Sequence, residues 1–369
     1  MIDSLRFRDK KFKILVCSDL YESANQSKHI NELKSKDTAL FLDASIKALD
    51  PDLVVFNGDC AFGDDEISLR EATDRITKTV RERDIPFAVV FGDEENDGQD
   101  IAQLRSIYSE YENCLFNLDS DKVSDNSDHY ALIHDENGVA KFNLWFFNSN
   151  GSTSQKDVSS KYDWVHDEQI ERYEKIANEL KENGVKKSIV FQHIPVVDEY
   201  RLMREAAAYE VPKAVKGSGF FSDRLYLPSE PLYGNYRDPI ECSDFNNGQF
   251  DSWKRTGDVK AAFFSNSHLN DFEGYLDKIL LAQCCATGFK GCHDGDRVGV
   301  KLITIDERDL SFKTKNWYFS DFGLKAQSVL PIDSKLSQKQ KKNIAIAGAA
   351  GAVIGASMML VSRLFKKKK

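Results

Sequence analysis

The feature that most constrains the fold is a series of short apolar runs that each end at an acidic turn. Each run is long enough for one strand, and an aspartate follows within two residues of its end. The runs and their aspartates are residues 12–17 with Asp19, residues 53–57 with Asp59, and residues 85–91 with Asp93. Continuous apolar runs of this length, bounded by turn residues, are typical of strands buried in a parallel sheet. We therefore expect three strands that end on carboxylates.

Segments with helical spacing separate these runs, which predicts βαβ units and an α/β fold with a largely parallel sheet. Ligand sites in such sheets lie beyond the carboxyl ends of the strands. The remaining segments are predicted as helices or strands, apart from one long irregular insertion. We expect helices at 37–49, 66–83 and 166–182, strands at 144–148, 188–192, 260–264, 278–283, 297–304 and 312–318, and the insertion at 208–252.

Two histidines follow predicted strands of the second half, His193 after residues 188–192 and His268 shortly after residues 260–264. Carboxylate and imidazole ligands together suit Mn, Fe, Zn or Mg rather than a soft-metal site. Two ions that share a carboxylate can clamp a phosphate and activate a water for in-line attack, and Asp59 is the natural bridge. Any one of these residues alone is as well explained by a helix cap or a surface histidine. Their shared position at strand ends favours a metal site.

The blocks around these residues resemble, in order, the motifs of the calcineurin-like metallophosphoesterases, in particular the branch related to purple acid phosphatases and Dcr-type phosphatases. The resemblance spans roughly residues 11–320. The blocks are Asp19, Asn57-Gly58-Asp59, Gly92-Asp93-Glu94-Glu95, Gln192-His193-Ile194-Pro195 and Ser267-His268-Leu269-Asn270-Asp271.

This resemblance implies a four-layer αββα sandwich that hydrolyses phosphomonoesters or phosphodiesters with a metal-bound water. It implies one or two divalent ions, without resolving Mn, Mg, Fe or Zn. The first ion would take Asp19, Asp59 and His268, and the second would take Asp59, Asp93 and His193. Asn266 stands where the family has a further histidine ligand. The candidates for catalytic residues are Glu94 and His193.

The chain departs from the family at four positions, of which Asp93 in place of an asparagine ligand can still bind a cation. Tyr21 replaces a histidine ligand, and a neutral phenol is a much poorer ligand than imidazole. Asn266 replaces another histidine, and its amide oxygen binds transition metals more weakly. Glu94 replaces the histidine that assists phosphoryl transfer, and an ionised carboxylate repels phosphate. The alternative to an active enzyme is therefore a catalytically impaired scaffold or regulatory protein that keeps the fold.

Charge is distributed unevenly along the chain. The formal net charge is -9 over 369 residues, and the last 35 residues hold nine Lys or Arg and no acid, so residues 1–334 carry about -18. An acidic body disfavours nucleic acid as a partner, since such binding depends on neutralising phosphates with Lys and Arg. Seven cysteines without paired spacing do not predict a disulfide framework, which favours a reducing compartment.

The C-terminus carries the strongest membrane signal. Residues 344–361 form an 18-residue uncharged stretch flanked by basic residues, and 18 residues of helix span about 27 Å, enough for a bilayer core. We divide the chain into a phosphoesterase domain (1–325), a basic linker (326–343), a transmembrane helix (344–361) and a basic tail (362–369). Gly351 and Gly355 offer a close-packing face for a homo-oligomer. The N-terminus lacks a signal-peptide core, so we expect a membrane-anchored protein whose body faces the cytosol.

Overall fold

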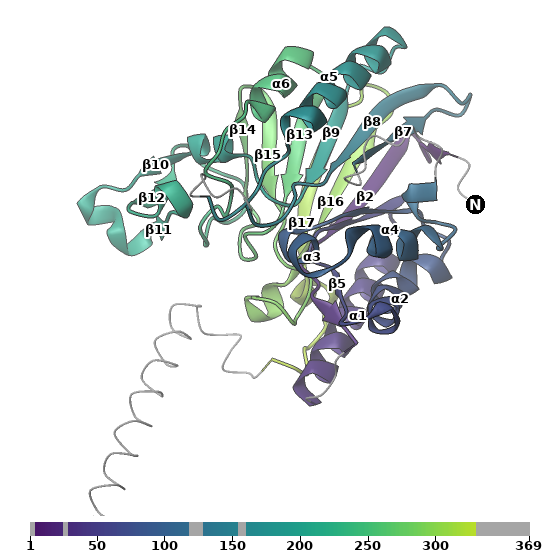
Figure 1. The fold of residues 1–369 in the computed structure, drawn as a ribbon, viewed down its shortest axis with the longest axis horizontal. Coiled ribbons are helices and arrows are strands. Elements are labelled where there is room, and N and C mark those ends of the chain that lie inside the picture. The colour runs from purple at the N-terminus through teal and green to yellow at the C-terminus, as the bar shows by residue number, and fades with distance from the viewer. Residues whose placement is uncertain (1–3, 25–28, 118–127, 154–159, 330–369) are drawn as a thin grey trace, which may run out of the picture.

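The computed structural model describes residues 4–24, 29–117, 128–153 and 160–329, which form four layers. Two β-sheets pack face to face in the middle, and helices cover the outer face of each sheet (Figure 1). The αββα sandwich expected from the resemblance is therefore present in the described part of the chain.

The smaller central sheet holds the N-terminal strands. Its order is β17-β16-β2-β4-β6, and β2, β4 and β6 run parallel while β16 and β17 are antiparallel to their neighbours. The strands are β2 (Lys11–Cys17), β4 (Leu53–Asn57), β6 (Phe87–Val90), β16 (Gly299–Asp306) and β17 (Phe312–Tyr318). The predicted βαβ arrangement of the first three apolar runs is confirmed.

The larger central sheet has the order β1-β7-β8-β9-β13-β15-β14. Its core strands β8, β9, β13 and β15 are parallel to one another. The strands are β1 (Leu5–Arg6), β7 (His129–His134), β8 (Ala140–Phe147), β9 (Ser188–Gln192), β13 (Val259–Phe264), β14 (Glu273–Leu276) and β15 (Ile279–Gln283).

Both faces of each central sheet are buried, which explains why the strands read as continuous apolar runs. Successive side chains of a strand point to opposite faces. In β2, Ile14 and Val16 pack between the sheets, while Leu15 and Cys17 pack under the helices. Fully burying an aliphatic or aromatic side chain stabilises a fold by about 1.5–3 kcal/mol, so these layers hold the strand ends in place.

Helices α1, α2 and α4 pack on the smaller sheet, and α5 and α6 pack on the larger one. The helices are α1 (His29–Leu49), α2 (Glu66–Glu82), α3 (Asp93–Gly98), α4 (Ile101–Ser109), α5 (Asp167–Glu182) and α6 (Gln249–Thr256). The prediction placed the start of the first helix too late, at residue 37. Its first two turns hold only two apolar residues, Ile30 and Leu33, so apolar spacing does not reveal them.

The insertion predicted as irregular contains short regular elements. A small antiparallel sheet, β10-β12-β11, projects from the body next to the larger sheet (Figure 1). The strands of this sheet are β10 (Met203–Glu205), β11 (Val215–Lys216) and β12 (Leu225–Pro228). Elsewhere in the chain, β3 (Glu22–Ser23) and β5 (Ala61–Phe62) form a separate two-stranded pair. The elements are too short to give a periodic signal.

The last described residues are tied to α1. The buried carboxylate of Asp37 accepts hydrogen bonds from the backbone N–H of Gln327 and Ser328 at 3.0 and 2.7 Å, and Val329 packs against the adjacent core. In the part of the chain that the structure describes, no helix combines the length and the apolar character needed to cross a bilayer. The predicted span, residues 344–361, lies outside the described residues, and the division of the chain stays a prediction.

A fully buried glutamate beneath the larger sheet predicts a pH dependence of stability. Glu199, in the 3-10 helix η2 (Val197–Leu202), accepts a 2.6 Å hydrogen bond from Gln283 at the end of β15, and its other oxygen has no partner in the described structure. Burial raises its pKa to about 8. The pKa of this carboxyl group is near 4.5 in the unfolded chain, so between about pH 4.5 and pH 8 it is protonated only in the folded state. The free energy of unfolding therefore falls by up to about 1.4 kcal/mol per pH unit as the pH rises through this range.

We expect Glu199→Gln to remove this slope, because an amide keeps the shape and carries no titratable proton. The measurement is the free energy of unfolding in urea between pH 5 and 9, for the wild type and the variant. The variant should gain stability relative to the wild type as the pH rises. Parallel curves across this range would contradict the assignment of a buried neutral carboxyl group.

Candidate metal centre

The site lies where the strands of both central sheets end. Asp19 follows β2, Asp59 follows β4, and His193 follows β9. The backbones of Asp19 and Asp59 adopt left-handed conformations, with φ of 51° and 52°, which are strained for residues with a side chain. The two loops hold each other in this form, since the N–H of Asp19 donates to the carbonyl of Gly58 and the N–H of Tyr21 donates to that of Asp59.

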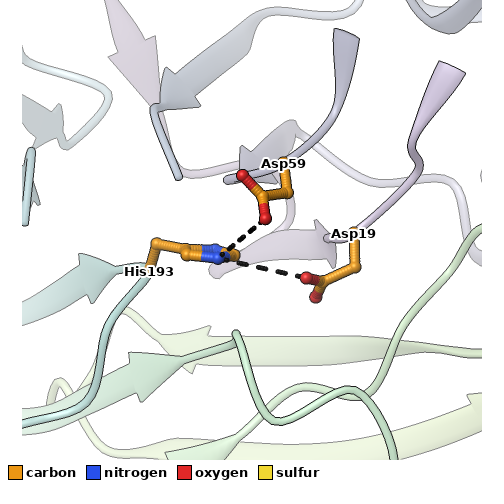
Figure 2. Close-up of side chains that lie close together, drawn as sticks. All are labelled: Asp19, Asp59 and His193. Atoms are coloured by element: carbon orange, nitrogen blue, oxygen red, sulfur yellow. Dashed lines mark ion pairs between the residues drawn. The ribbon is translucent and has the colours of Figure 1, made fainter. Parts of the chain in front are cut away.

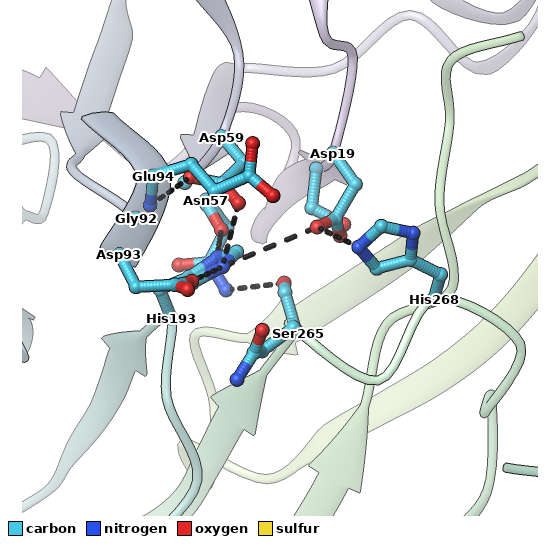
Figure 3. Close-up of polar contacts among 12 residues, drawn as sticks. Asp19, Asn57, Asp59, Gly92, Asp93, Glu94, His193, Ser265 and His268 are labelled. Carbon is cyan, nitrogen blue, oxygen red and sulfur yellow. Dashed lines mark hydrogen bonds and ion pairs between the residues drawn. The ribbon is translucent and has the colours of Figure 1, made fainter. Parts of the chain in front are cut away.

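Three predicted ligands converge on one point. Ligand atoms of Asp19, Asp59 and His193 all lie within 4.8 Å of one another, as Figure 2 shows. Nε2 of His193 is 3.5 Å from Oδ2 of Asp59 and 4.0 Å from Oδ1 of Asp19. Asp93, the first residue of α3, joins them with Oδ1 at 3.2 Å from the same nitrogen (Figure 3).

His193 is oriented by its other ring nitrogen. Nδ1 lies 2.9 Å from the backbone carbonyl of Asn57, which can only accept, so Nδ1 carries a hydrogen. Nε2 therefore faces the carboxylates, and the ring is completely buried. The amide nitrogen of Asn57 in turn donates to Ser265 at 2.9 Å and to the carbonyl of Gln192 at 3.2 Å, which ties β4 to the loops after β9 and β13. Such supporting hydrogen bonds fix the geometry of metal-ligating histidines.

The buried polar atoms of this cluster fit a divalent cation. Both carboxylate oxygens of Asp19, Oδ1 of Asp93 and Nε2 of His193 are buried and lack a hydrogen-bond partner within the described structure. Buried polar groups are almost always hydrogen-bonded, so several buried ligand atoms without such a partner around one point fit a bound cation. Ligands that share an ion at about 2.1 Å lie about 3 to 4 Å apart. The distances from Nε2 of His193 fall in this range.

The charges of the cluster influence one another strongly. Burial raises the pKa of Asp19, although His268 and His193 oppose the shift. Burial also acts to raise the pKa of Asp59, but the neighbouring His193 and the Tyr21 hydroxyl hold that pKa below the usual value. Burial disfavours a charged His193, yet Asp59, Asp93 and Asp19 together raise its pKa well above the ordinary one. The site therefore attracts positive charge.

His268 lies at the other side of Asp19. Its Nε2 is 3.3 Å from Oδ1 of Asp19 and 3.4 Å from the Tyr21 hydroxyl, while its Nδ1 is 3.2 Å from the carbonyl of Cys292. Burial lowers the pKa of this imidazole, but Asp19 and the contact with Cys292 together outweigh burial and raise it to about 9. His268 is therefore brought into the site, in contact with Asp19 and Tyr21.

The two other predicted site residues lie at its border. The N–H of Glu94 donates to Oδ1 of Asp59 at 3.1 Å, and its exposed side chain extends beside that carboxylate (Figure 3). Partial burial of the carboxyl group, with repulsion from Asp59 and Asp93, raises its pKa. The amide nitrogen of Asn266 donates to the backbone carbonyl of Glu241 at 2.8 Å, which leaves its oxygen as the only side-chain atom able to act as a ligand.

Sequence reasoning did not assign a role to Glu95, which holds two loops of the site together. Its fully buried carboxylate accepts hydrogen bonds from four backbone N–H groups, at 2.9 to 3.1 Å. The donors are Asp59, Cys60, Ala61 and Gly92. Burial, with repulsion from Asp59, raises its pKa to about 7. A glutamate three residues after the N-cap Gly92 is a known capping pattern, and it is the one sequence signal for this role.

Gly92 makes room for Asp59. A Cβ atom at this position would lie 2.2 Å from Oδ1 of Asp59, whereas a Cβ at Gly98, at the other end of α3, would meet no heavy atom within 4 Å. We expect Gly92→Ala to displace Asp59 and weaken Mn²⁺ binding by about 10- to 100-fold. Gly98→Ala is the matched control and should leave it unchanged. Calorimetric titration of both variants with Mn²⁺ checks this, and equal affinities would refute the role of Gly92.

Curated proteins similar to this chain include phosphatase relatives. The chain is 26% identical over 344 residues to "Probable inactive purple acid phosphatase 14" of Arabidopsis thaliana, covering 83% of this chain and 77% of the relative. It is 24% identical over 280 residues to "Phosphatase DCR2" of Saccharomyces cerevisiae, covering 71% of this chain and 45% of that relative. A dimetal phosphatase from Danio rerio is a structural neighbour at 10% identity and a TM-score of 0.47, covering 82% of this chain and 98% of the neighbour.

The family model of the calcineurin-like phosphoesterases matches residues 12–220, more than half of the chain. The matched segment contains Asp19, Asp59, Asp93 and His193, which the structure brings together at one point. The chain belongs to the calcineurin-like phosphoesterase family.

Proposed function

We propose that this protein hydrolyses phosphate esters in a metal-dependent reaction at the cluster of Asp19, Asp59, Asp93 and His193. The observation that carries the proposal is the set of buried ligand atoms without hydrogen-bond partners, which face one point at the strand ends. Membership of the phosphoesterase family supports the reaction class.

A divalent ion bound there would supply Lewis-acid chemistry, which neutralises charge on a phosphate and acidifies water. The chain contributes the geometry. The Nδ1 hydrogen bond to Asn57 keeps the other nitrogen of His193 directed at the carboxylates. His268 places an imidazole beside Asp19, at the opposite side from His193. Glu94 borders the site and is the group proposed to meet the leaving group.

The test is hydrolysis by the full-length chain in detergent, after removal of metal with a chelator. An aryl phosphate and an aryl phosphodiester are each assayed with Mn, Mg, Fe and Zn in turn. Turnover that appears on addition of one of these metals and disappears with chelator supports the proposal. No turnover of either ester with any of the metals, in protein shown by circular dichroism to be folded, would count against it.

One observation favours a second candidate, a regulatory protein that keeps the fold without turnover. Several relatives carry the name "Probable inactive purple acid phosphatase", and Tyr21, Glu94 and Asn266 replace family histidines in this chain. The hydrolysis assay, combined with metal analysis, separates the candidates. Bound metal without hydrolysis of either ester favours the regulatory protein, and so does a folded chain that retains no metal at all.

We also propose that residues 344–361 anchor the chain in a membrane, with the body in the cytosol and Gly351 and Gly355 available for helix pairing. The uncharged stretch and its basic flanks support this. The test is membrane fractionation of the full chain and of a chain ending at Ser334. The full chain should sediment with membranes and resist carbonate extraction, while the shortened chain should stay in the supernatant. Equal sedimentation of both would overturn the anchor.

A further inference from the structure

The Tyr21 hydroxyl fills the half of the site that the family resemblance assigns to the first ion. That ion would need Asp19, Asp59 and His268. In the structure the hydroxyl donates to Oδ2 of Asp59 at 2.9 Å and lies 3.4 Å from Nε2 of His268. The Tyr21 hydroxyl therefore contacts Asp59 and His268, which are two of the three residues that would have to bind that ion. The hydroxyl acts here as a hydrogen-bond donor to the Asp59 carboxylate.

Packing fixes the tyrosine in this place. Its ring stacks on Phe62, with centroids 5.5 Å apart and planes 17° apart. On the loop that follows β15, a Cβ atom at Gly291 would lie 2.6 Å from Cδ2 of Tyr21, so only glycine leaves room for the ring there. The backbone N–H of Tyr21 is also bound, at 3.0 Å, to the carbonyl of Asp59. These packing contacts and the backbone hydrogen bond hold the Tyr21 hydroxyl against the Asp59 carboxylate.

Both carboxylate oxygens of Asp59 already accept hydrogen bonds. One of its oxygens, Oδ1, accepts the N–H of Glu94 at 3.1 Å. The other, Oδ2, accepts the Tyr21 hydroxyl and faces His193 at 3.5 Å. Two ions about 3.5–4 Å apart need a carboxylate shared between them. Oδ2 of Asp59 faces His193, and the Tyr21 hydroxyl lies between this oxygen and Nε2 of His268, 2.9 Å from the first and 3.4 Å from the second.

The ligand atoms that lack a hydrogen-bond partner face the point between Asp19, Asp93 and His193. Both oxygens of Asp19, Oδ1 of Asp93 and Nε2 of His193 are buried and accept or donate no hydrogen bond in the described structure, and they approach one another and His268 only as ion pairs at 3.2 to 4.0 Å. We propose that the protein binds a single divalent ion on Asp19, Asp59, Asp93 and His193, and that Tyr21 and His268 occupy the place of a second ion. This inference refines the metal site on which the proposed function rests.

The test is the number of Mn²⁺ ions bound by the full-length chain, measured by calorimetric titration and by electron paramagnetic resonance of the loaded protein. The wild type should bind one ion and give the spectrum of isolated Mn²⁺. Tyr21→His should bind two and give the spectrum of a coupled pair, because an imidazole replaces the hydroxyl with a ligand. Tyr21→Phe is the matched control, which removes the hydroxyl without adding a ligand, and it should still bind one.

Two ions in the wild type, or none, would overturn the inference, even if the variants failed to fold. A single ion in folded Tyr21→His would also overturn it, because Tyr21 would then not be what excludes the second ion. The outcome is independent of turnover. One bound ion without hydrolysis would reject the proposed function and keep the inference. Hydrolysis with two bound ions would keep the proposed function and reject the inference.

Discussion

Asp59→Asn is expected to lower metal-dependent hydrolysis by about 1,000-fold, the range seen when a group that stabilises charge at the reacting centre is removed. Asp59 faces His193 at 3.5 Å and receives hydrogen bonds from Tyr21 and from the backbone of Glu94. The amide has nearly the same shape but lacks the negative charge, and its nitrogen cannot bind a cation. Loss of affinity for the ion and loss of turnover should therefore appear together.

The measurement compares kcat/KM and Mn²⁺ affinity of this variant with those of Asp64→Asn. Asp64 is an exposed aspartate five residues further along the chain, so the control makes the same chemical change outside the site. It should leave both quantities within about twofold of the wild type, since an isolated surface charge contributes little. Equal activity of the two variants would show that hydrolysis does not depend on the cluster.

Asp258→Ala is expected to destabilise the fold by about 3–5 kcal/mol, one of the largest effects a single substitution produces. The buried carboxylate of Asp258 accepts three hydrogen bonds: from the Trp145 indole at 3.2 Å, the Tyr173 hydroxyl at 2.7 Å and the Ser188 hydroxyl at 2.6 Å. These donors come from β8, α5 and β9. Alanine would leave the Trp145 and Ser188 donors buried and unpaired, while Tyr173 would keep only Thr256 as a partner, and each unpaired group costs about 1–3 kcal/mol.

The free energy of unfolding in urea checks this prediction. Asp258→Asn, which keeps the volume and one acceptor oxygen, should lose less stability than Asp258→Ala. The exposed Asp251 in α6 is the control position, and Asp251→Ala should change stability by at most about 0.5 kcal/mol. A loss below about 1 kcal/mol for Asp258→Ala would mean that the three donors find other partners.

Asp258 also shows where sequence reasoning ends. The preceding Gly257 ends α6 in a left-handed conformation with φ of 70°, which the sequence signals locally because glycine favours such positions. The contacts of Asp258 come from residues 70 to 113 positions away in the chain, which no local pattern reveals. The same holds for Glu95 and Asn57, which support the metal cluster through backbone groups of other loops.

The strand ends, by contrast, could be predicted because local chemistry determines them. Strands buried on both faces need continuous apolar runs, and the turns that follow admit aspartates at the sheet edge. This is why the sequence alone predicts Asp19, Asp59 and His193 as neighbours, and the structure places their ligand atoms within 4.8 Å of one another. The place of Tyr21 could not be predicted in the same way. Its substitution for a histidine was visible, but its hydrogen bond to Asp59 depends on the packing of Phe62 and Gly291 around the ring.

The most direct test of the metal centre is anomalous X-ray diffraction from crystals of the protein grown with Mn²⁺, recorded at the manganese edge. We predict a strong peak within bonding distance of Asp19, Asp59, Asp93 and His193, and no second peak beside Tyr21 and His268. A map without a peak at this cluster, from crystals that contain Mn²⁺ at other carboxylates, would contradict the metal centre and with it the proposed hydrolysis.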